Sequence, residues 1–479
     1  MTGDRSSRRA FLRRGAAVTL PAAVAGCQFR DETPETTTPD RDQTTDSPTP
    51  TTPTSRERLA AAYDDRFDEY VDVVAAGASP DGSEPIDDVL ERVVADDTLA
   101  YVPAGTYRVN SLRVEDVSNA GLVAESPAET SLVPGRPAVD IGHQFLQFHG
   151  VSDFLFEGFT LDYRASGAGG ATQVFSRGDF AVRDLRVRGT MPDESLPGNP
   201  AAFRFDVREE SATGTVEHVV ARDGGHDGGN AVGLYVGAAH AGTLEFVDCE
   251  VRNFPNNGLY ASAPGRDDEA LRGRDGTVHV RGGRYANNNI ANVRLGSTDS
   301  TARDVTVVVD ERPPSHAGAM NARGLRIRNR SGIVVEDCEI RIGEDAGEGF
   351  GGLVFHPNAG TSTIRDTTIR VDRDDTPAVR ALDDDAADPS PGPTFENVTV
   401  TGSAAGGWAV EIAGRADVAF EDCTVSGTGP GRNGLSFTAC ENCVVDGGEI
   451  DVPGIPVRGR RSTVETLDVR TGDALDSEQ

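Results

Sequence analysis

The stretch LEFVDCEV at residues 244–251 recurs with small changes, as VVEDCEI at residues 334–340 and as VAFEDCTV at residues 418–425. Each copy is followed by a turn rich in Gly or Asn and then by a second short apolar segment. These second segments all begin with Gly-Leu and cover residues 233–236, 258–261, 324–327, 352–355 and 434–437. The spacing of roughly 25–35 residues is typical of a solenoid, in which each repeat stacks on its neighbours.

The repeat unit favours a parallel β-helix over other folds. Its strands are only four or five residues long, and their side chains alternate between inside and outside. No segment of helical period separates the strands, which excludes β-α-β crossovers. The Leu and Asn spacing of leucine-rich repeats is absent, and an antiparallel sandwich lacks such a register. We therefore predict an all-β chain, a single-stranded right-handed parallel β-helix of about ten to twelve coils.

The cysteines fit the same repeat. Cys249, Cys338 and Cys423 each follow an aspartate, so they occupy one recurrent coil position with several coils between copies. Coils lie about 4.8 Å apart, so these thiols are too distant to form disulfides with one another and should be small buried residues. Cys440 and Cys443 form a lone C-x-x-C, without the second pair that a metal site needs. A local disulfide and two free thiols both remain open for this pair.

The chain before the repeats shows a second recognisable order. Residues 56–76 have apolar side chains at helical spacing and are predicted to form an amphipathic helix. Then come Asp81-Gly82, a helical stretch near residues 85–95, and the segment Pro103-Ala104-Gly105-Thr106-Tyr107. This order resembles the opening of the pectate-lyase-like superfamily, in which a helix caps the first coil. The resemblance implies a β-helix over residues 77–475 with an N-terminal capping helix, and it favours polysaccharides as the class of ligand.

The resemblance does not carry a specific activity. The Asn-Thr-Asp, Asp-Asp, His-Gly and Arg-Ile-Lys set of polygalacturonases is absent, as is the Arg-x-Pro-x-x-Arg pattern of pectate lyases. The Asp-Pro-His-Glu motif of alginate epimerases is also missing. Polysaccharide lyases, glycoside hydrolases and epimerases therefore remain open, because a shared fold does not fix chemistry.

The N-terminal residues match a signal for export from the cell. Residues 7–13 read SRRAFLR, which matches a twin-arginine signal, and an apolar stretch too short to span a bilayer follows. The stretch ends Val-Ala-Gly before Cys27, which resembles a lipobox with Cys27 as the lipid-modified residue. Residues 1–27 are thus predicted to be a signal peptide, and residues 28–55, rich in Thr, Pro and Asp, a disordered tether. We expect an extracellular, cell-surface protein that contacts the membrane through its lipid anchor only.

The charge balance limits the classes of partner that the protein can bind. The chain has 77 acidic and 46 basic residues, for a net charge of −31, and every basic residue is arginine. A polyanion of this size repels nucleic acid and anionic membrane surfaces, so both are poor candidates for partners of the protein body. The acid excess and the absent lysine resemble proteins of extreme halophiles, and together with the signal they indicate a haloarchaeal-type lipoprotein. We expect a monomer, since the ends show no segment that would form a trimer.

Aligning the second strands of the repeats exposes a candidate binding face. The inward positions are Phe203, Leu234, Leu259, Val293, Leu325, Leu353, Val379, Val410 and Leu435. The outward positions that follow them are Arg204, Tyr235, Tyr260, Arg294, Arg326, Val354, Arg380, Glu411 and Ser436. Tyrosine rings suit sugars and arginine forks suit carboxylates, so a substrate-binding surface for an acidic polysaccharide is predicted on Arg204, Tyr235, Tyr260, Arg294 and Arg326. The alternative is a solvated face with local salt bridges.

The turns beside this face hold the candidate catalytic groups. Residues 223–230, DGGHDGGN, place one of only eight histidines between aspartates. In a sugar-cleaving β-helix, Asp206, Asp223, His226 and Asp227 could transfer protons. The same aspartates could bind calcium through oxygen ligands, although no cofactor or metal site is certain, or could simply be the residues that tight turns use. The predicted function is binding and processing of an acidic polysaccharide by a lyase or glycoside hydrolase; the alternative is a non-catalytic glycan-binding or structural surface protein.

Overall fold

The computed structural model describes residues 61–63, 66–192, 200–268, 271–383 and 388–472. The predicted signal peptide, the lipidation site at Cys27 and the tether at residues 28–55 lie outside these ranges. Contacts divide the chain into Met1–Arg66 and Phe67–Gln479, and everything below concerns the second unit. No helix within the described ranges is both long and apolar enough to cross a membrane.

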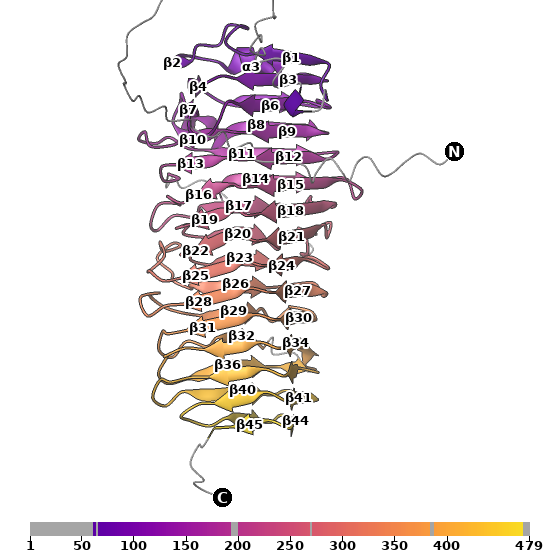
Figure 1. Cartoon of the computed structure of the whole chain (residues 1–479), viewed down its shortest axis with the longest axis vertical. Helices are drawn as coiled ribbons and strands as arrows, with labels where there is room; N and C mark the ends of the chain where they lie inside the picture. The colour runs from indigo at the N-terminus through magenta and orange to yellow at the C-terminus, as the bar shows by residue number, and fades with distance from the viewer. Residues whose placement is uncertain (1–60, 64–65, 193–199, 269–270, 384–387, 473–479) are drawn as a thin grey trace, which may run out of the picture. The chain divides into compact units, whose positions relative to one another are not determined.

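Three long parallel sheets make up this unit (Figure 1). Their strands follow one another in the order sheet 1, sheet 2, sheet 3 around every coil but the first and the last, which lack a strand of sheet 3. Sheet 1 contains β1 (Glu69–Asp72), β3 (Thr98–Val102), β6 (Gly121–Ala124), β9 (Phe154–Glu157), β12 (Phe180–Arg183), β15 (Thr213–Glu217), β18 (Thr243–Val247), β21 (Thr277–Arg281), β24 (Thr301–Arg303), β27 (Ile333–Glu336), β30 (Ser362–Arg365), β34 (Pro393–Glu396), β38 (Ala419–Glu421), β41 (Cys443–Asp446) and β44 (Val464–Leu467). Sheet 2 contains β2 (Asp81–Pro85), β4 (Gly105–Val109), β7 (Thr130–Pro134), β10 (Thr160–Asp162), β13 (Arg186–Arg188), β16 (Val220–Ala221), β19 (Glu250–Arg252), β22 (Arg284–Ala286), β25 (Thr306–Val309), β28 (Glu339–Ile342), β31 (Thr368–Val371), β35 (Thr399–Thr401), β39 (Thr424–Ser426), β42 (Glu449–Asp451) and β45 (Arg470–Thr471). Sheet 3 contains β5 (Leu112–Glu115), β8 (Gln144–Val151), β11 (Ala171–Ser176), β14 (Ala201–Val207), β17 (Val232–Val236), β20 (Asn257–Ala261), β23 (Ala291–Leu295), β26 (Arg323–Ile327), β29 (Gly351–Phe355), β32 (Val379–Ala381), β36 (Trp408–Ala413), β40 (Asn433–Thr438) and β43 (Val457–Arg460).

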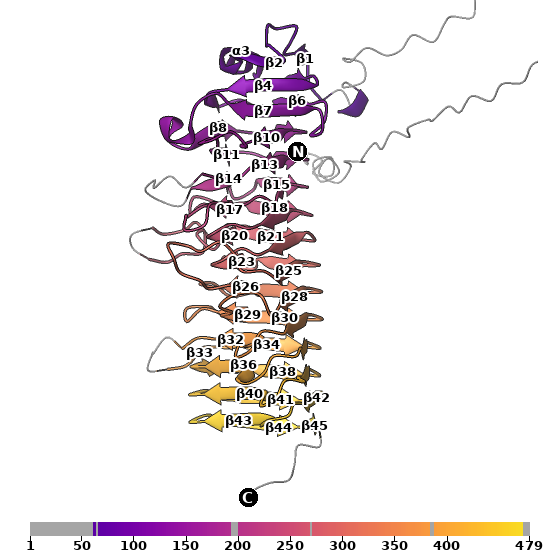
Figure 2. The ribbon, with the colours of Figure 1, turned by 90° about the vertical axis from the view of Figure 1, so that its left-hand side faces the viewer.

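Each strand pairs in parallel with the equivalent strand of the next coil, as the stacked arrows in Figure 2 show. The fold is therefore a right-handed parallel β-helix, as the resemblance to the pectate-lyase-like superfamily implied. Two of the sheets contain fifteen strands, so the expected ten to twelve coils were too few. Some coils are shorter than the repeat spacing suggested, such as the one that leads from His279 to its partner Thr301. A strand pair outside the sheets, β33 (Ser390–Pro391) with β37 (Arg415–Ala416), and a 3₁₀ turn, η1 (Ala138–Ile141), lie in the loops.

The N-terminal end of the β-helix differs from the prediction. The amphipathic helix expected over residues 56–76 does not continue to residue 76, because β1 (Glu69–Asp72) is a strand that pairs with β3. The β-helix consequently begins before the predicted boundary at residue 77. The spacing of Phe67, Tyr70 and Val74 matched a helix, but the four residue pairs that join β1 to β3 and the burial of Phe67 and Val73 favour the extended form. The short helix α3 (Asp87–Val93) buries Leu90 and Val93 in the first coil.

The recurrent Asp-Cys pair forms the corner between sheet 1 and sheet 2. The aspartate adopts a left-handed backbone conformation, with φ of 48° at Asp248, 52° at Asp337 and 51° at Asp422. Asp tolerates this conformation better than most residues with a side chain, so it turns the chain without glycine. The cysteines that follow are free and buried, namely Cys249, Cys338 and Cys423. Cys440 and Cys443 are also free and buried, which agrees with the second of the two alternatives for this pair.

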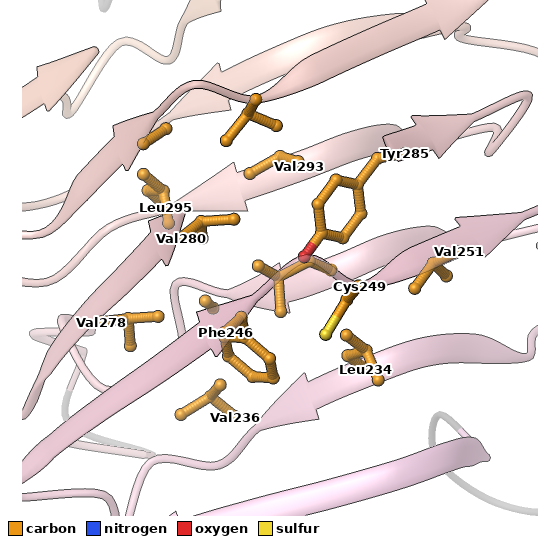
Figure 3. Close-up of a cluster of buried hydrophobic side chains, with 14 of the residues drawn as sticks. Leu234, Val236, Phe246, Cys249, Val251, Val278, Val280, Tyr285, Val293 and Leu295 are labelled. Carbon is orange, nitrogen blue, oxygen red and sulfur yellow. The ribbon is translucent and has the colours of Figure 1, made fainter. Parts of the chain in front are cut away.

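The core is a set of aliphatic and ring side chains stacked along the axis (Figure 3). Leu234, Phe246 and Val251 contribute from the three sheets of one coil region, and Val280 and Val293 continue the stack above them. Each of these side chains is at most 1% exposed. Burial at this density along the axis fixes the strand register, because a shift by one residue would turn a whole apolar column outward.

Candidate functional site

The strand register of sheet 3 confirms the two columns read from the sequence. Leu234 pairs with Leu259, then Val293 and Leu325, and these inward side chains have no exposed surface. The outward positions also lie in line. They pair in the order Arg204, Tyr235, Tyr260, Arg294, Arg326, Val354, Arg380, Glu411 and Ser436.

The centre of the outward column is a group of arginines without acidic partners. Arg294 is only 7% exposed and lies 4.0 Å from the centroid of the Tyr260 ring. Neither Arg294 nor Arg326 donates a hydrogen bond or forms an ion pair with any described residue, and their Nε atoms are buried without a partner. Arg328 directly follows β26, and its Nε is also buried and unpartnered among the described residues.

The pKa values of these arginines reflect burial and mutual repulsion. Burial lowers the pKa of Arg294 to about 9, and the charges of Arg328 and Arg326 add to the effect. The pKa of Arg326 also falls to about 9, through burial and then through Arg323 and Arg328. Like charges this close disfavour one another's protonation. An anion placed among these side chains would remove the penalty on all of them.

A cavity of about 630 Å³ opens beside the arginines. Its lining is almost entirely polar. The residues around it are Asn256, Tyr260, Arg266, Asp267, Asp268, Ile290, Arg294, His316, Arg328, Asn329 and Asn358.

One wall of the cavity belongs to the loop that follows β20. Asp267 lies 3.4 Å from the Nη1 of Arg330, and Asp268 accepts a hydrogen bond of 2.7 Å from the Nε of Arg266. A third aspartate, Asp275, accepts hydrogen bonds from the backbone and hydroxyl of Thr298. The carboxylates of this wall are thus held by their own neighbours, and the cavity keeps its cationic character.

The opposite wall is held by a long-range contact from residues 223–230. The Asp227 carboxylate accepts hydrogen bonds from the backbone N–H of Ser315 at 2.6 Å and from its hydroxyl at 2.9 Å. The same bonds, the backbone one first, lower the pKa of Asp227. The backbone N–H of Gly228 also donates to the Ser315 carbonyl. His316 follows in the cavity wall, with its Nδ1 buried and unpartnered among the described residues.

The asparagine side chains in the turn between β22 and β23 form hydrogen bonds with backbone atoms. Asn288 donates to the Val251 carbonyl and accepts from the backbone N–H of Phe254, and its amide also contacts Asn292. Asn289 likewise bonds backbone atoms of the following turn. These side chains satisfy buried polar groups of neighbouring coils, which is a structural role.

The structure does not gather the four predicted catalytic residues at the cavity. Asp206 is fully buried, accepts a hydrogen bond of 2.7 Å from the Gly237 N–H, and has a pKa raised by burial. Asp223 accepts from the Gly189 N–H in the preceding coil, whereas Asp227 bonds forward to Ser315. His226 and Asp227 are exposed. None of the four lines the cavity, and a catalytic role for them stays a prediction.

Unlike the predicted catalytic residues, some of the predicted binding residues do lie at the cavity. Tyr260 and Arg294 line the cavity, and Arg326 stands next to Arg294 in the register. Tyr235 and Arg204 continue the column toward the N-terminus, with the rings of Tyr235 and Tyr260 5.1 Å apart. Arg328 and the loop after β20 were missed by the sequence reasoning. Arg328 lies two positions beyond Arg326 and so points to the same face, a signal that strand alternation could have provided.

A metal centre has no support from the geometry. Within the described ranges, no three His, Cys, Asp or Glu side chains are grouped so that they could hold a metal ion. Calcium in the Asp-rich turn at residues 223–230 is thus left as a prediction from the sequence.

Comparisons with known proteins return only distant structural likenesses. No protein-family model and no curated protein sequence matches the chain. Among solved structures, the A-module of the mannuronan C-5 epimerase AlgE4 of Azotobacter vinelandii is 13% identical, with a TM-score of 0.43 over 84% of this chain and 97% of that one. The catalytic unit of a GH87 alpha-1,3-glucanase from Streptomyces thermodiastaticus is 15% identical, with a TM-score of 0.43 over 85% and 70%. The surface protein and adhesin PfbA of Streptococcus pneumoniae is 11% identical, with a TM-score of 0.38 over 84% and 97%.

Proposed function

We propose that the cavity at Tyr260, Arg294 and Arg328 binds a carboxylate-bearing unit of an acidic polysaccharide. The observation that carries this proposal is the register pair of buried Arg294 and half-buried Arg326, which has no acidic partner among the described residues. A cation withdrawn from water without a counter-charge is costly unless a ligand supplies the charge. Guanidinium forks match carboxylates in shape and in hydrogen-bond direction.

The alternative of a solvated face with local salt bridges explains only the flanks of the column. Arg204 lies 3.3 Å from Asp206, and the Nε of Arg380 lies 2.9 Å from Glu411. Between these pairs, Arg294 and Arg326 remain without carboxylates in a chain of net charge −31. The arrangement therefore concentrates positive charge at one place on an otherwise acidic molecule.

Sugar units suit the remaining lining of the cavity. Tyr260 presents a partly exposed ring beside Arg294, and Asn329 and Asn358 present amides. Rings stack on the apolar faces of sugars, while amides exchange hydrogen bonds with hydroxyl groups. Long-range repulsion between two polyanions is weak in molar salt, where charges are screened beyond about 3 Å. Binding by direct arginine contact survives those conditions.

The direct test is retention of polysaccharides by the full chain in molar salt. Polygalacturonate, alginate and hyaluronate carry carboxylates, whereas dextran is neutral and serves as the control. We expect at least one of the three uronans to be retained and dextran to pass. Retention of dextran alone, or of none of the four, contradicts the proposal.

Cleavage by β-elimination is a second candidate, favoured by His316. The arginines would neutralise the uronate carboxylate, and the imidazole of His316, which lines the cavity, would accept the proton from the carbon beside it. The bond from the adjacent carbon to the glycosidic oxygen then breaks, and the leaving oxygen takes a proton from water. Hydrolysis is less well supported, because the cavity carboxylates Asp267 and Asp268 are engaged by arginines.

The two candidates differ in their products. Elimination produces an unsaturated uronate with ultraviolet absorbance as well as a new reducing end. Replacing His316 with Gln should abolish that absorbance while polymer retention persists. Retention by the wild-type chain without any new ends would leave binding alone as the function.

We also propose that the protein acts outside the cell, held by lipid at Cys27. The support is the sequence order of twin arginines, apolar stretch and lipobox. A Cys27→Ser variant should appear in the medium or the soluble fraction, whereas the wild-type chain should sediment with membranes. Equal sedimentation of the two chains contradicts the anchor.

A further inference from the structure

The outward column of sheet 3 is closed on one side of the arginines. Val354 is the next position after Arg326, and its side chain has no exposed surface. Phe350, just before β29, is flanked by two guanidinium groups: Arg323 lies 4.0 Å and Arg380 4.8 Å from its ring centroid. These two arginines come from β26 and β32, the strands that pair with β29 on either side. The ring and its two partners therefore span three consecutive strands of sheet 3.

Beyond β29, the outward side chains of sheet 3 contact one another. Arg380 pairs with Glu411 at 2.9 Å, and the Nη2 of Arg458 lies 3.4 Å from the hydroxyl of Ser436. Arg458 also lies 4.2 Å from the centroid of the Trp408 ring. Arg380 and Arg458 each donate a hydrogen bond to a described side chain of this column, which Arg294 and Arg326 do not.

The column remains accessible toward the N-terminus. Tyr260 and Tyr235 are partly exposed, and the side chain of Arg204 is 38% exposed. Arg204 lies over two rings, 4.9 Å from the centroid of Phe175 and 5.4 Å from that of Tyr235. Five rungs, from β14 to β26, therefore offer rings and guanidinium groups over roughly 20 Å at a strand spacing of about 4.8 Å.

We propose that Phe350, clamped by Arg323 and Arg380, closes this surface, so that the protein binds the end of a polysaccharide chain and not its interior. This inference rests on the proposed function. The terminal unit places its carboxylate among Arg294, Arg326 and Arg328, and the following units lie over Tyr260, Tyr235 and Arg204. A chain that continued past β26 would have to displace the Phe350 ring and the Arg380–Glu411 pair.

The number of protein molecules bound per polymer chain tests this. Calorimetric titration of the full chain would use short and long fractions of whichever of polygalacturonate, alginate or hyaluronate is retained. End binding predicts one protein per polymer chain at every length. A ratio that rises in proportion to length means interior binding and overturns the inference, whereas retention of none of the three overturns the proposed function itself.

A variant at Phe350 tests whether this ring closes the binding surface. Phe350→Ala should allow interior binding, so that the ratio rises with length, and the matched control Trp408→Ala should leave it at one. Trp408 is stacked with an arginine on the same sheet, which controls for loss of such a contact. If Phe350→Ala fails to fold, Phe350→Leu replaces it, and the wild-type ratio remains decisive for end binding. A folded Phe350 variant that stays at one protein per chain contradicts the role of this ring.

Discussion

The outer faces of sheet 1 and sheet 3 arrange charge in opposite ways along the same axis. On sheet 1, Arg183 lies between Glu157 and Glu217, with ion-pair distances of 3.9 Å and 3.6 Å. Farther along, Glu336 lies between Arg303 and Arg365, at 2.9 Å and 2.7 Å. The sign of charge thus changes from one rung to the next over these stretches.

Sheet 3 breaks that pattern at its centre. Arg294 and Arg326 are direct register partners, and Arg328 directly follows the strand that holds Arg326. Like charges at one strand spacing destabilise a sheet. Sheet 1 also contains such a pair, Arg281 with Arg303, but both of these side chains are exposed to solvent, whereas Arg294 is only 7% exposed. The difference teaches that like charges mark a candidate functional surface where they are withdrawn from water.

Removing one arginine from each face gives the largest expected contrast. Arg294→Leu should weaken uronan binding about 10- to 100-fold, because a charge-assisted hydrogen bond contributes about 1.5–3 kcal/mol. The same change should leave the free energy of unfolding unchanged or raise it by about 1 kcal/mol, because a buried charge without a partner is removed. Titration calorimetry and denaturant unfolding measure the two effects.

The matched control is Arg183→Leu on sheet 1, whose guanidinium has two carboxylate neighbours. Binding should be unaffected, and stability should fall by about 1–3 kcal/mol, because the largely buried carboxylates of Glu157 and Glu217 lose their partner. The contrast between the faces is lost if Arg294→Leu destabilises the fold as Arg183→Leu does and leaves uronan binding intact.

Most of the fold could be predicted from local sequence patterns. The columns around Leu234 and Tyr235 could be aligned from sequence because a β-helix repeats each strand position, and alternation assigns each side chain to one side. The N-terminal segment was misassigned since Phe67, Tyr70 and Val74 fit a helix, whereas pairing of β1 with β3 decided otherwise. That pairing is a tertiary effect that local spacing does not contain.

The site was only half predictable for a related reason. Tyr260 and Arg294 follow from strand alternation, but the wall around His316 depends on a bond between Asp227 and Ser315, residues 88 positions apart. Loop residues carry no repeat register, so no sequence pattern indicates which of them meet. The same limit explains why the aspartates of residues 223–230 suggested a catalytic cluster, although they bond in opposite directions.

Asp206 allows a smaller test, because here sheet 3 does pair an arginine with a carboxylate. Burial raises the pKa of Asp206, with Arg204 opposing the shift. A carboxyl group whose pKa is higher in the folded state destabilises the fold once the pH exceeds the unfolded value of about 3.9. Asp206→Asn should therefore raise the free energy of unfolding at neutral pH by about 1 kcal/mol, and the difference from wild type should shrink as the pH falls.

Denaturant unfolding at several pH values measures this, with uronan binding as the control for the integrity of the face. A loss of stability in Asp206→Asn at neutral pH would mean that the Arg204–Asp206 pair stabilises sheet 3 as the pairs of sheet 1 do. The difference between the two faces would then be confined to Arg294 and Arg326.

The smallest expected effect concerns Glu336 on sheet 1, whose pH dependence should have the opposite sign. The hydrogen bond from Arg365, followed by the charge of Arg303, lowers the pKa of Glu336. A carboxylate with a lowered folded pKa contributes stability above the unfolded value of about 4.3, and that stability disappears as the pH falls through the folded pKa. Glu336→Gln should therefore be slightly less stable than wild type at neutral pH, with the two chains converging in acid. Molar salt should reduce the difference, because both arginines are partly exposed and screening weakens exposed pairs. A deficit that persists unchanged in acid would trace the loss to packing, and the alternating charges of sheet 1 would no longer account for its stability.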